Sequence, residues 1–133
     1  MIVIDASSLA KYVLKEENWN IVREHLEEDS YSLDLALAEV ANAIWKHHII
    51  HKKVNLENAF LMFKVLDTIK EVVTFESLLI YLKDAQKISI EERISIYDSL
   101  YITQSKKYHK LLTSDKKQHK IAEKIGIEVI FVD

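Results

Sequence analysis

Two aspartates stand directly after short, mainly apolar stretches, near opposite ends of the chain. Asp5 follows Ile2-Val3-Ile4, and Asp115 follows Leu111-Leu112-Thr113-Ser114. A short apolar run that ends in a polar turn is typical of a strand buried on both faces, as in the middle of a parallel sheet. Open α/β folds bind ligands beyond the carboxyl ends of such strands. If the two strands are parallel, both carboxylates emerge at one edge, although Asp115 alone also suits a helix N-cap.

Glu39 lies in a helix-like stretch that follows the second expected strand. Its neighbours include Ala36, Ala38 and Ala43, whose small side chains leave room for a ligand to approach a carboxylate. The alternative is a solvated glutamate in the first turn of a helix, where the helix dipole favours a negative charge. The first interpretation places Glu39 in the same cleft as Asp5.

Asp98 stands among apolar and aromatic residues. Its neighbours on a helix surface are Ile94, Tyr97, Tyr101 and Ile102. A carboxylate in such surroundings loses hydration and needs a compensating partner. The alternative is a capping box in which Ser95 begins the helix and Asp98 closes its first turn. Ser89 and Glu92 fit that pattern too, so the start of this helix stays open.

Four carboxylates in one cleft require a counter-charge. Two carboxylates about 4 Å apart repel each other by roughly 4 kcal/mol at an effective dielectric constant near 20. Ligands that are all oxygen suit Mg²⁺ or Mn²⁺.

A zinc site at the histidines is the other metal hypothesis. His47 and His51 have the spacing of a zinc pair, but His48 stands where a zinc protease needs a glutamate. The two histidines also lie at the end of the expected helix, where a helix C-terminus favours protonated histidine.

Strand-like and helix-like stretches alternate along the chain, which predicts a parallel sheet with helices on both faces. The expected strands lie near residues 1–5, 31–33, 72–75, 111–113 and 127–132. The expected helices lie near residues 8–14, 18–28, 35–51, 55–70, 76–87, 93–108 and 116–125. Gly126 is placed to end the last helix in a left-handed cap. With no linker or repeat, residues 1–133 are expected to form a single domain.

The composition excludes several kinds of chemistry. The chain has no cysteine, which rules out disulfides, thiol catalysis and cysteine-ligated zinc. Its one glycine is too few for a P-loop, a dinucleotide fingerprint or the serine elbow of the α/β-hydrolases. No apolar run reaches the 18 residues of a membrane span, and no signal peptide is predicted, so a cytoplasmic location is expected.

The net charge of −3 counts mildly against nucleic-acid binding, but the lysines are unevenly placed. Four of them adjoin the acids in sequence and could hold phosphates beside the metal: Lys46, Lys116, Lys117 and Lys120. A solvated lysine-rich surface is the alternative. The helix at 55–70 is apolar over a wider arc than one buried face needs, which fits either core packing or a surplus face for a partner or a homodimer.

The chain resembles the PIN-domain nucleases, and within them the toxin subunits of VapBC toxin–antitoxin modules. Four blocks carry the resemblance in the family order: Val3-Ile4-Asp5-Ala6-Ser7, Leu37-Ala38-Glu39-Val40-Ala41-Asn42-Ala43, Tyr97-Asp98-Ser99-Leu100-Tyr101 and Leu112-Thr113-Ser114-Asp115. The resemblance implies a three-layer α/β/α sandwich around a central, mostly parallel five-stranded sheet. It also implies an endoribonuclease that uses Mg²⁺ or Mn²⁺, a VapB-like antitoxin that covers the cleft, and a homodimer.

The family pattern assigns roles to particular residues of this chain. Asp5, Glu39 and Asp98 match the core metal-binding acids, and Asp115 matches the fourth acid. Ser7 and Thr113 match small polar residues that support the site. Two positions depart from the pattern: many members carry a further acid where this chain has Lys117, and often an aromatic residue where it has Gln118. Whether a second metal binds is therefore open.

Other interpretations compete with the toxin. A catalytically silent domain of the same fold would only bind a protein partner, and the wide apolar helix at 55–70 supports it. A haloacid dehalogenase-type protein needs a second aspartate two residues after the first, where Ser7 stands. A response-regulator receiver needs paired acids near its first strand, and only Asp5 is in place. The flap-type DNA nucleases are longer and richer in acids.

Overall fold

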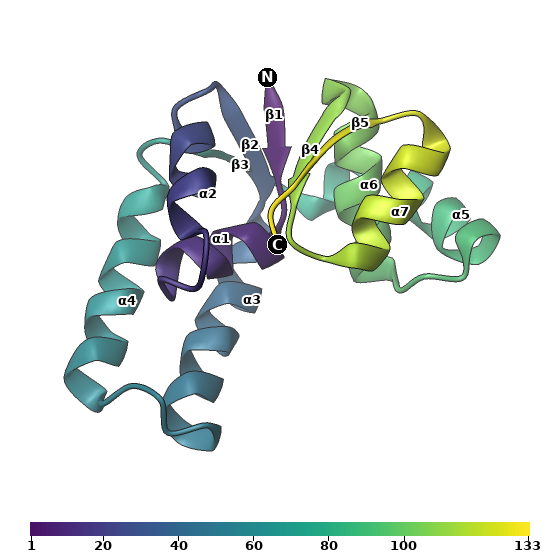
Figure 1. The fold of residues 1–133 in the computed structure, drawn as a ribbon. Helices are drawn as coiled ribbons and strands as arrows, with labels where there is room; N and C mark the ends of the chain where they lie inside the picture. The colour runs from purple at the N-terminus through teal and green to yellow at the C-terminus, as the bar shows by residue number, and fades with distance from the viewer.

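A five-stranded sheet forms the centre of the computed structural model, which describes all residues 1–133 (Figure 1). The strands are β1 (Ile2–Ile4), β2 (Ser30–Leu33), β3 (Thr74–Glu76), β4 (Lys110–Thr113) and β5 (Glu128–Phe131). Their order in the sheet is β3-β2-β1-β4-β5, and every neighbouring pair is parallel. All five carboxyl ends therefore lie at one edge, and the sheet is wholly rather than mostly parallel.

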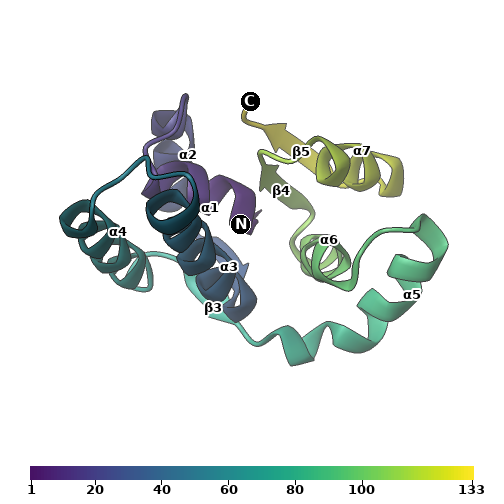
Figure 2. The same ribbon diagram turned by 90° about the horizontal axis from the view of Figure 1, so that it is seen from below.

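Helices cover both faces of this sheet. On one side lie α1 (Ala6–Val13), α2 (Trp19–Leu26), α3 (Asp34–Trp45) and α4 (Leu56–Ile69), and on the other lie α5 (Leu82–Glu92), α6 (Ile96–Tyr108) and α7 (Lys116–Ile125) (Figures 1 and 2). The chain builds the first side and then crosses to the second after β3. The predicted three-layer α/β/α fold is confirmed. Its topological switch point lies between β1 and β4, the central strand and its later neighbour.

Burial on both faces explains the apolar runs of the central strands. Ile2, Val3 and Ile4 are at most 1% exposed, and Leu111 and Leu112 are fully covered. A strand with helices on both faces has no solvent-facing side, so its residues do not alternate between apolar and polar. The edge strands β3 and β5 remain partly exposed. The strands β1 and β4, which end at the switch point, thus lie largely in the buried core.

The expected helix at 76–87 is wrong at both ends. Glu76 ends β3, a 3₁₀ turn η2 (Leu78–Ile80) follows, and α5 runs from Leu82 to Glu92. The carboxylate of Glu76 accepts hydrogen bonds from the Tyr81 hydroxyl and the Gln104 side-chain amide, which hold this residue at the end of the strand. The β3 strand therefore continues one residue past its predicted end.

The expected helix at 93–108 also begins too early. α5 ends at Glu92, and its C-cap residue Arg93 has a left-handed φ of 55°. Ser95 then caps α6 by accepting a hydrogen bond from the backbone N–H of Asp98. Ser89 lies inside α5, so the helix start left open by the sequence is at Ser95. Gly126 ends α7 with a φ of 96°, and its predicted role as a left-handed cap is confirmed.

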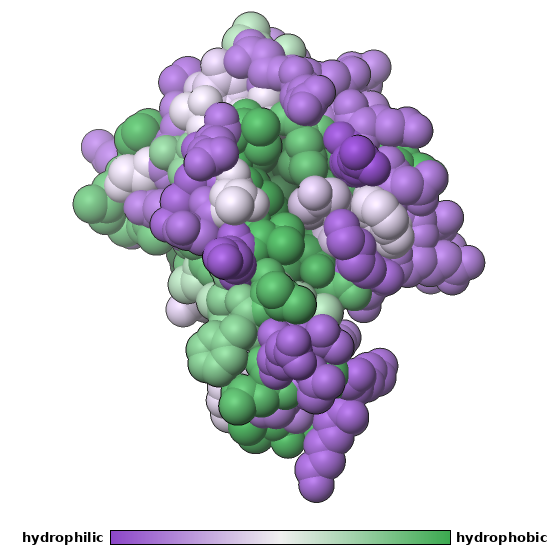
Figure 3. All heavy atoms as spheres, turned by 90° about the vertical axis from the view of Figure 1, so that its left-hand side faces the viewer, coloured by the Kyte–Doolittle hydropathy of each residue, from purple (hydrophilic) through white to green (hydrophobic).

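The helices α3 and α4 project together beyond the carboxyl edge of the sheet (Figure 1). A π-helical turn η1 (Lys46–Ile50) continues α3, so the expected helix at 35–51 is interrupted near its end. Several large apolar side chains on this projection are 47–62% exposed: Trp45, Ile49, Ile50, Leu56, Phe60 and Leu61. Hydrophobic surface continues onto this part of the molecule in Figure 3. No helix of the structure is long and apolar enough to cross a membrane.

Candidate active site

The four acids selected from the sequence line a single pocket at the carboxyl edge of the sheet. Asp5 follows β1, Glu39 lies in α3, Asp98 lies in the first turn of α6, and Asp115 precedes α7. The pocket has a volume of about 250 Å³. It lies at the switch point, where the helices that follow β1 and β4 diverge to opposite faces (Figure 2). Segments from both halves of the chain therefore contribute carboxylates to one space.

Asp5 is the buried acid of the pocket and is only 2% exposed. One carboxylate oxygen accepts hydrogen bonds from the Ser7 hydroxyl at 2.7 Å and from the backbone N–H of Ser8 at 3.1 Å. The other accepts a hydrogen bond from the Thr113 hydroxyl at 2.5 Å. Asp5 also caps the N-terminus of α1. Ser7 and Thr113, predicted as supporting residues, therefore hold this carboxylate in place.

Asp98 and Asp115 combine a capping position with a place in the pocket. Asp115 is the N-cap of α7 and accepts a hydrogen bond from the backbone N–H of Gln118. The backbone N–H of Asp98 donates to the capping Ser95, while the Asp98 carboxylate lines the pocket. For both residues, the sequence offered the cap and the site as alternatives. The structure places each of them in both.

The pKa values of Asp5, Glu39 and Asp98 are raised in the pocket. Burial raises the pKa of Asp5 from 3.8 to about 6, and the Asp115 charge adds to this effect against the hydrogen bonds from Thr113 and Ser7. Burial, and then the Asp115 charge, raises the pKa of Asp98. Burial also raises the pKa of Glu39, where the Tyr101 hydroxyl opposes the shift and the Asp98 charge adds to it. A cation among these acids would relieve their mutual repulsion.

Proteins of known family match nearly the whole chain. The model of the PIN domain matches residues 2–124. The chain belongs to the PIN-domain family. Ribonuclease VapC3 of Pyrobaculum aerophilum is 30% identical to this PIN domain in an alignment of length 126 that covers 92% of this chain and 93% of the relative.

Two solved structures share the fold of this PIN domain. PAE2754 from Pyrobaculum aerophilum superposes with a TM-score of 0.65 at 20% identity, over 96% of this chain and 89% of that chain. FitAcB from Neisseria gonorrhoeae superposes with a TM-score of 0.63 at 16% identity, over 99% of this chain and 97% of that chain. Likeness at this level of identity concerns the architecture alone.

The donor set of the pocket suits a hard divalent cation, because carboxylate oxygens are the ligands that Mg²⁺ and Mn²⁺ prefer. The side chains as they lie do not complete a site, since no group of three histidine, aspartate or glutamate residues converges closely enough to hold an ion. An ion in this pocket would therefore take its remaining oxygen ligands from water, from rotated carboxylates or from another polar group. His47 and His51 contact each other edge to face, with ring centroids 5.8 Å apart, and have no third ligand.

The pocket of this PIN domain contains residues that the sequence did not mark as functional. Tyr101 and Gln118 line it, together with the small residues Ala6, Ala10 and Ala43. The Tyr101 hydroxyl donates to Glu39 at 2.7 Å and so orients that otherwise exposed carboxylate. The spacing of Tyr101 three residues after Asp98 was the available signal, because residues at that spacing share a helix face. Of the three alanines noted beside Glu39, only Ala43 lines the pocket.

The four lysines proposed to bind RNA are all exposed, but they differ in their relation to the acids. Lys117 lies close enough to Asp98 for its charge to lower the pKa of that acid. Lys116 and Lys120 lie on the same helix, α7, whereas Lys46 begins η1 on the α3–α4 projection. Lys117 is thus the lysine whose position best fits a phosphate beside the acid pocket.

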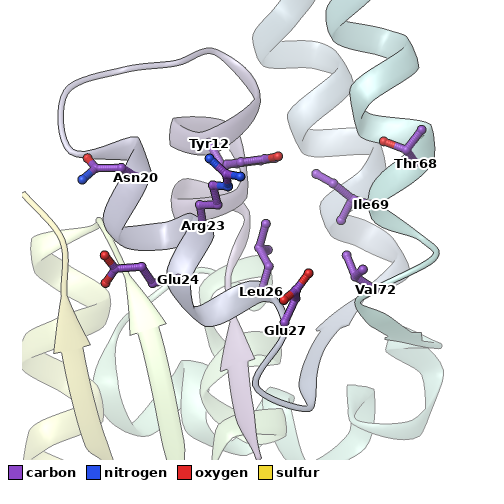
Figure 4. A pocket seen from close by; sticks show the side chains of 9 residues that line it. All are labelled: Tyr12, Asn20, Arg23, Glu24, Leu26, Glu27, Thr68, Ile69 and Val72. Carbon is purple, nitrogen blue, oxygen red and sulfur yellow. The ribbon is translucent and has the colours of Figure 1, made fainter.

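Larger hollows lie elsewhere on the surface. A groove of about 610 Å³ runs between α2 and α4, and Figure 4 shows Tyr12, Arg23 and Ile69 among its lining side chains. A second groove of about 660 Å³ lies between α5 and α6. Neither groove is lined by Asp5, Glu39, Asp98 or Asp115. Open α/β folds bind their ligands beyond the carboxyl ends of the strands, where the acid pocket lies. Chemistry rather than size therefore identifies the acid pocket as the candidate site.

Proposed function

We propose that residues 1–133 form a single PIN domain that acts as an Mg²⁺- or Mn²⁺-dependent endoribonuclease. The observation that supports this most strongly is the convergence of four acids on one pocket, with the pKa of Asp5, Asp98 and Glu39 raised. Its relative VapC3 is named a ribonuclease, which supports RNA as the substrate. The Asp5, Glu39, Asp98 and Asp115 carboxylates are the proposed metal-binding and catalytic residues.

The proposed reaction is hydrolysis of an RNA phosphodiester bond by an attacking water. A bound divalent cation supplies Lewis acidity, which lowers the pKa of water and neutralises charge on the phosphoryl oxygens. Asp5, fixed by Ser7, Ser8 and Thr113, offers its carboxylate at a constant position. Tyr101 orients Glu39 toward the same pocket. No protein nucleophile is required, which agrees with the absence of cysteine.

The direct test is cleavage of a mixed pool of structured RNAs in Mn²⁺ or in chelator. We expect wild type to cleave only with Mn²⁺, and we expect Asp98→Asn to lose about 10²-fold or more, since a lost metal ligand costs several kcal/mol of charge stabilisation. Asp84→Asn is the matched control, because Asp84 is an exposed aspartate on α5 outside the pocket. Cleavage that survives chelation, or that Asp98→Asn leaves unchanged, would contradict the proposal.

Lys117 is expected to contribute to RNA binding through its charge. In Lys117→Ala we expect weaker binding of RNA and a salt dependence of the binding constant that is shallower by about one unit, as for one lost phosphate contact. Lys83→Ala on α5 serves as the control, since Lys83 is exposed and does not line the acid pocket. The measurement is fluorescence anisotropy with labelled RNA and Asp98→Asn protein over a series of salt concentrations. If the binding constant depends on salt concentration equally steeply in Lys117→Ala and Lys83→Ala, Lys117 does not contact the RNA.

We further propose that the chain is the toxin of a type II toxin–antitoxin pair in the cytoplasm, with a VapB-like antitoxin as its partner. The groove between α2 and α4 (Figure 4) and the exposed apolar side chains of the α3–α4 projection (Figure 3) are the surfaces that support a protein partner or a homodimer. Expression in cells tests this proposal, because growth arrest by wild type and relief of arrest by Asp98→Asn are the expected outcomes.

The alternative is a catalytically silent PIN domain that acts as a protein-interaction module. The exposed Leu56, Phe60 and Leu61 of α4 favour it, since they are more than 50% exposed without any role in the acid pocket. Calorimetric titration with Mn²⁺ separates the two functions. A silent domain has no need of a cation, whereas the nuclease requires one that Asp98→Asn weakens.

A further inference from the structure

Gln118 lies in the acid pocket with an unused polar group. It is only 3% exposed, it lines the same pocket as the four acids, and its side-chain oxygen has no hydrogen-bond partner in the protein. A buried polar atom without a partner costs about 1–3 kcal/mol. Such an atom calls for an explanation, because the great majority of buried polar groups in proteins are hydrogen-bonded.

A local capping role does not account for this side chain. Asp115 is the N-cap of α7 and Gln118 is the third residue of the helix, so the pair has the spacing of a capping box. In that motif the third residue would accept a hydrogen bond from the backbone N–H of the cap. Here the N–H of Asp115 donates to the Thr113 hydroxyl at 3.0 Å instead. The Gln118 amide is thereby left free of the helix end.

The four acids of the pocket cannot donate a hydrogen bond to the Gln118 oxygen when they are charged, and the hydroxyls of Ser7 and Tyr101 already donate to Asp5 and Glu39. In their ionised forms, the four acids of the pocket can accept hydrogen bonds but cannot donate them: Asp5, Glu39, Asp98 and Asp115. An amide oxygen is also an acceptor and cannot donate. A cation, in contrast, is attracted both by the four carboxylates and by the Gln118 oxygen. Because the carboxylates do not converge in threes, a site in this pocket also needs oxygen ligands beyond them.

We propose that Gln118 supplies a neutral oxygen ligand to the divalent cation of this pocket. The inference rests on the proposed metal-dependent function and adds to it a residue that the acid pattern does not contain. Rotation about the last side-chain bond exchanges the positions of the amide oxygen and nitrogen, so the proposed role requires the rotamer in which the oxygen faces the pocket. A neutral ligand adds coordination without adding to the repulsion among the carboxylates.

Mn²⁺ affinity of the full chain, measured by calorimetry without RNA, tests the proposal. We expect Gln118→Leu to weaken binding by about 10-fold or more, the range in which groups around a metal affect its affinity. We expect Gln118→Glu to bind Mn²⁺ more tightly than wild type, because it adds a charged oxygen at the same place. Gln104→Leu is the matched control: Gln104 is also fully buried with an unpartnered oxygen, but it lies outside the pocket.

The outcomes distinguish this inference from the function on which it rests. If wild type binds Mn²⁺ with an affinity that Asp98→Asn lowers but both Gln118 variants leave unchanged, the metal site stands and Gln118 is not part of it. If wild type binds no Mn²⁺, the proposed function itself fails, and the ligand role fails with it. A loss of RNA affinity in chelator for Gln118→Leu, with Mn²⁺ affinity unchanged, would make Gln118 an RNA contact and overturn the proposal.

Discussion

In chelator at pH 7, Asp5→Asn is expected to be more stable toward unfolding than wild type, by up to about 3 kcal/mol. The pKa of Asp5 rises from 3.8 to about 6 on folding because the carboxyl group becomes buried. At pH 7 the folded protein carries this group ionised, and the shift of roughly two pKa units corresponds to about 3 kcal/mol at 1.36 kcal/mol per unit. Asparagine keeps the shape and the capping oxygen without the charge, while its amide NH₂ faces the Thr113 hydroxyl as a donor where Asp5 is an acceptor.

The effect has a defined dependence on pH. Between pH 3.8 and 6 the folded state binds more protons at Asp5 than the unfolded state, so the contribution of Asp5 to stability falls as the pH rises through this window. Well below pH 3.8 both states carry the proton, and wild type and Asp5→Asn should unfold at similar free energies. Their difference should therefore open between pH 4 and about pH 7.

Urea unfolding at several pH values, with and without Mn²⁺, measures this difference. Mn²⁺ at 1,000 times its dissociation constant should reverse the order at pH 7, since a ligand that binds only the folded state then stabilises it by about 4.1 kcal/mol. The same substitution should abolish cleavage. A variant that is less stable than wild type at pH 7 in chelator would show that Asp5 is not held as a strained, ionised acid.

Thr113→Val is expected to destabilise the protein by about 2–4 kcal/mol at pH 7. The Thr113 hydroxyl donates to Asp5 and accepts from the backbone N–H of Asp115, so valine removes a hydrogen bond to a charged group and leaves an N–H unpaired. Thr113 is itself fully buried, so water does not replace these bonds. Because the lost bond lowers the pKa of Asp5, its removal raises that pKa further.

The cost of Thr113→Val should consequently depend on pH. Near pH 4, where Asp5 is protonated, the lost bond joins neutral groups and the destabilisation should fall to about 1–2 kcal/mol. Thr103→Val makes the same chemical change at a buried threonine whose hydroxyl donates to the Ser99 carbonyl in α6. That control should cost about 1 kcal/mol or less at both pH values. Equal costs for Thr113→Val at pH 4 and pH 7 would contradict the coupling between Thr113 and Asp5.

The strands of the sheet and the acids of the pocket were predictable because each is marked by a short pattern of consecutive residues in the sequence. A strand covered on both faces is an uninterrupted apolar run, and an acid after such a run lies at the carboxyl edge whatever the rest of the chain does. Asp5 and Asp115 are of this kind. Asp98 was selected because it is a charged residue among apolar and aromatic neighbours. In the structure, Asp98 and one of these neighbours, Tyr101, line the pocket together. The PIN-domain resemblance then brought the blocks together in one order.

The boundary between α5 and α6 and the role of Gln118 could not be predicted in the same way. No glycine or proline marks the end of α5, where Arg93 adopts the left-handed conformation that glycine usually takes. Gln118 has the spacing of a capping residue, and only the structure shows that Thr113 occupies the backbone N–H it would have used. The convergence of the acids also stops short of a complete ligand set, a matter of side-chain rotation that spacing does not encode.

Two hydrogen bonds at and beside Asp5 join segments that are more than a hundred residues apart in the chain. Thr113 donates to Asp5 across 108 positions, and the Ser8 hydroxyl contacts the Ser114 hydroxyl across 106. A chain still being synthesised therefore carries its first acid long before β4 exists to hold it. The pocket is assembled only when the chain has been synthesised beyond Asp115. In this topology, a nascent chain that ends before β4 lacks Thr113 and Asp115 and therefore has no complete acid pocket.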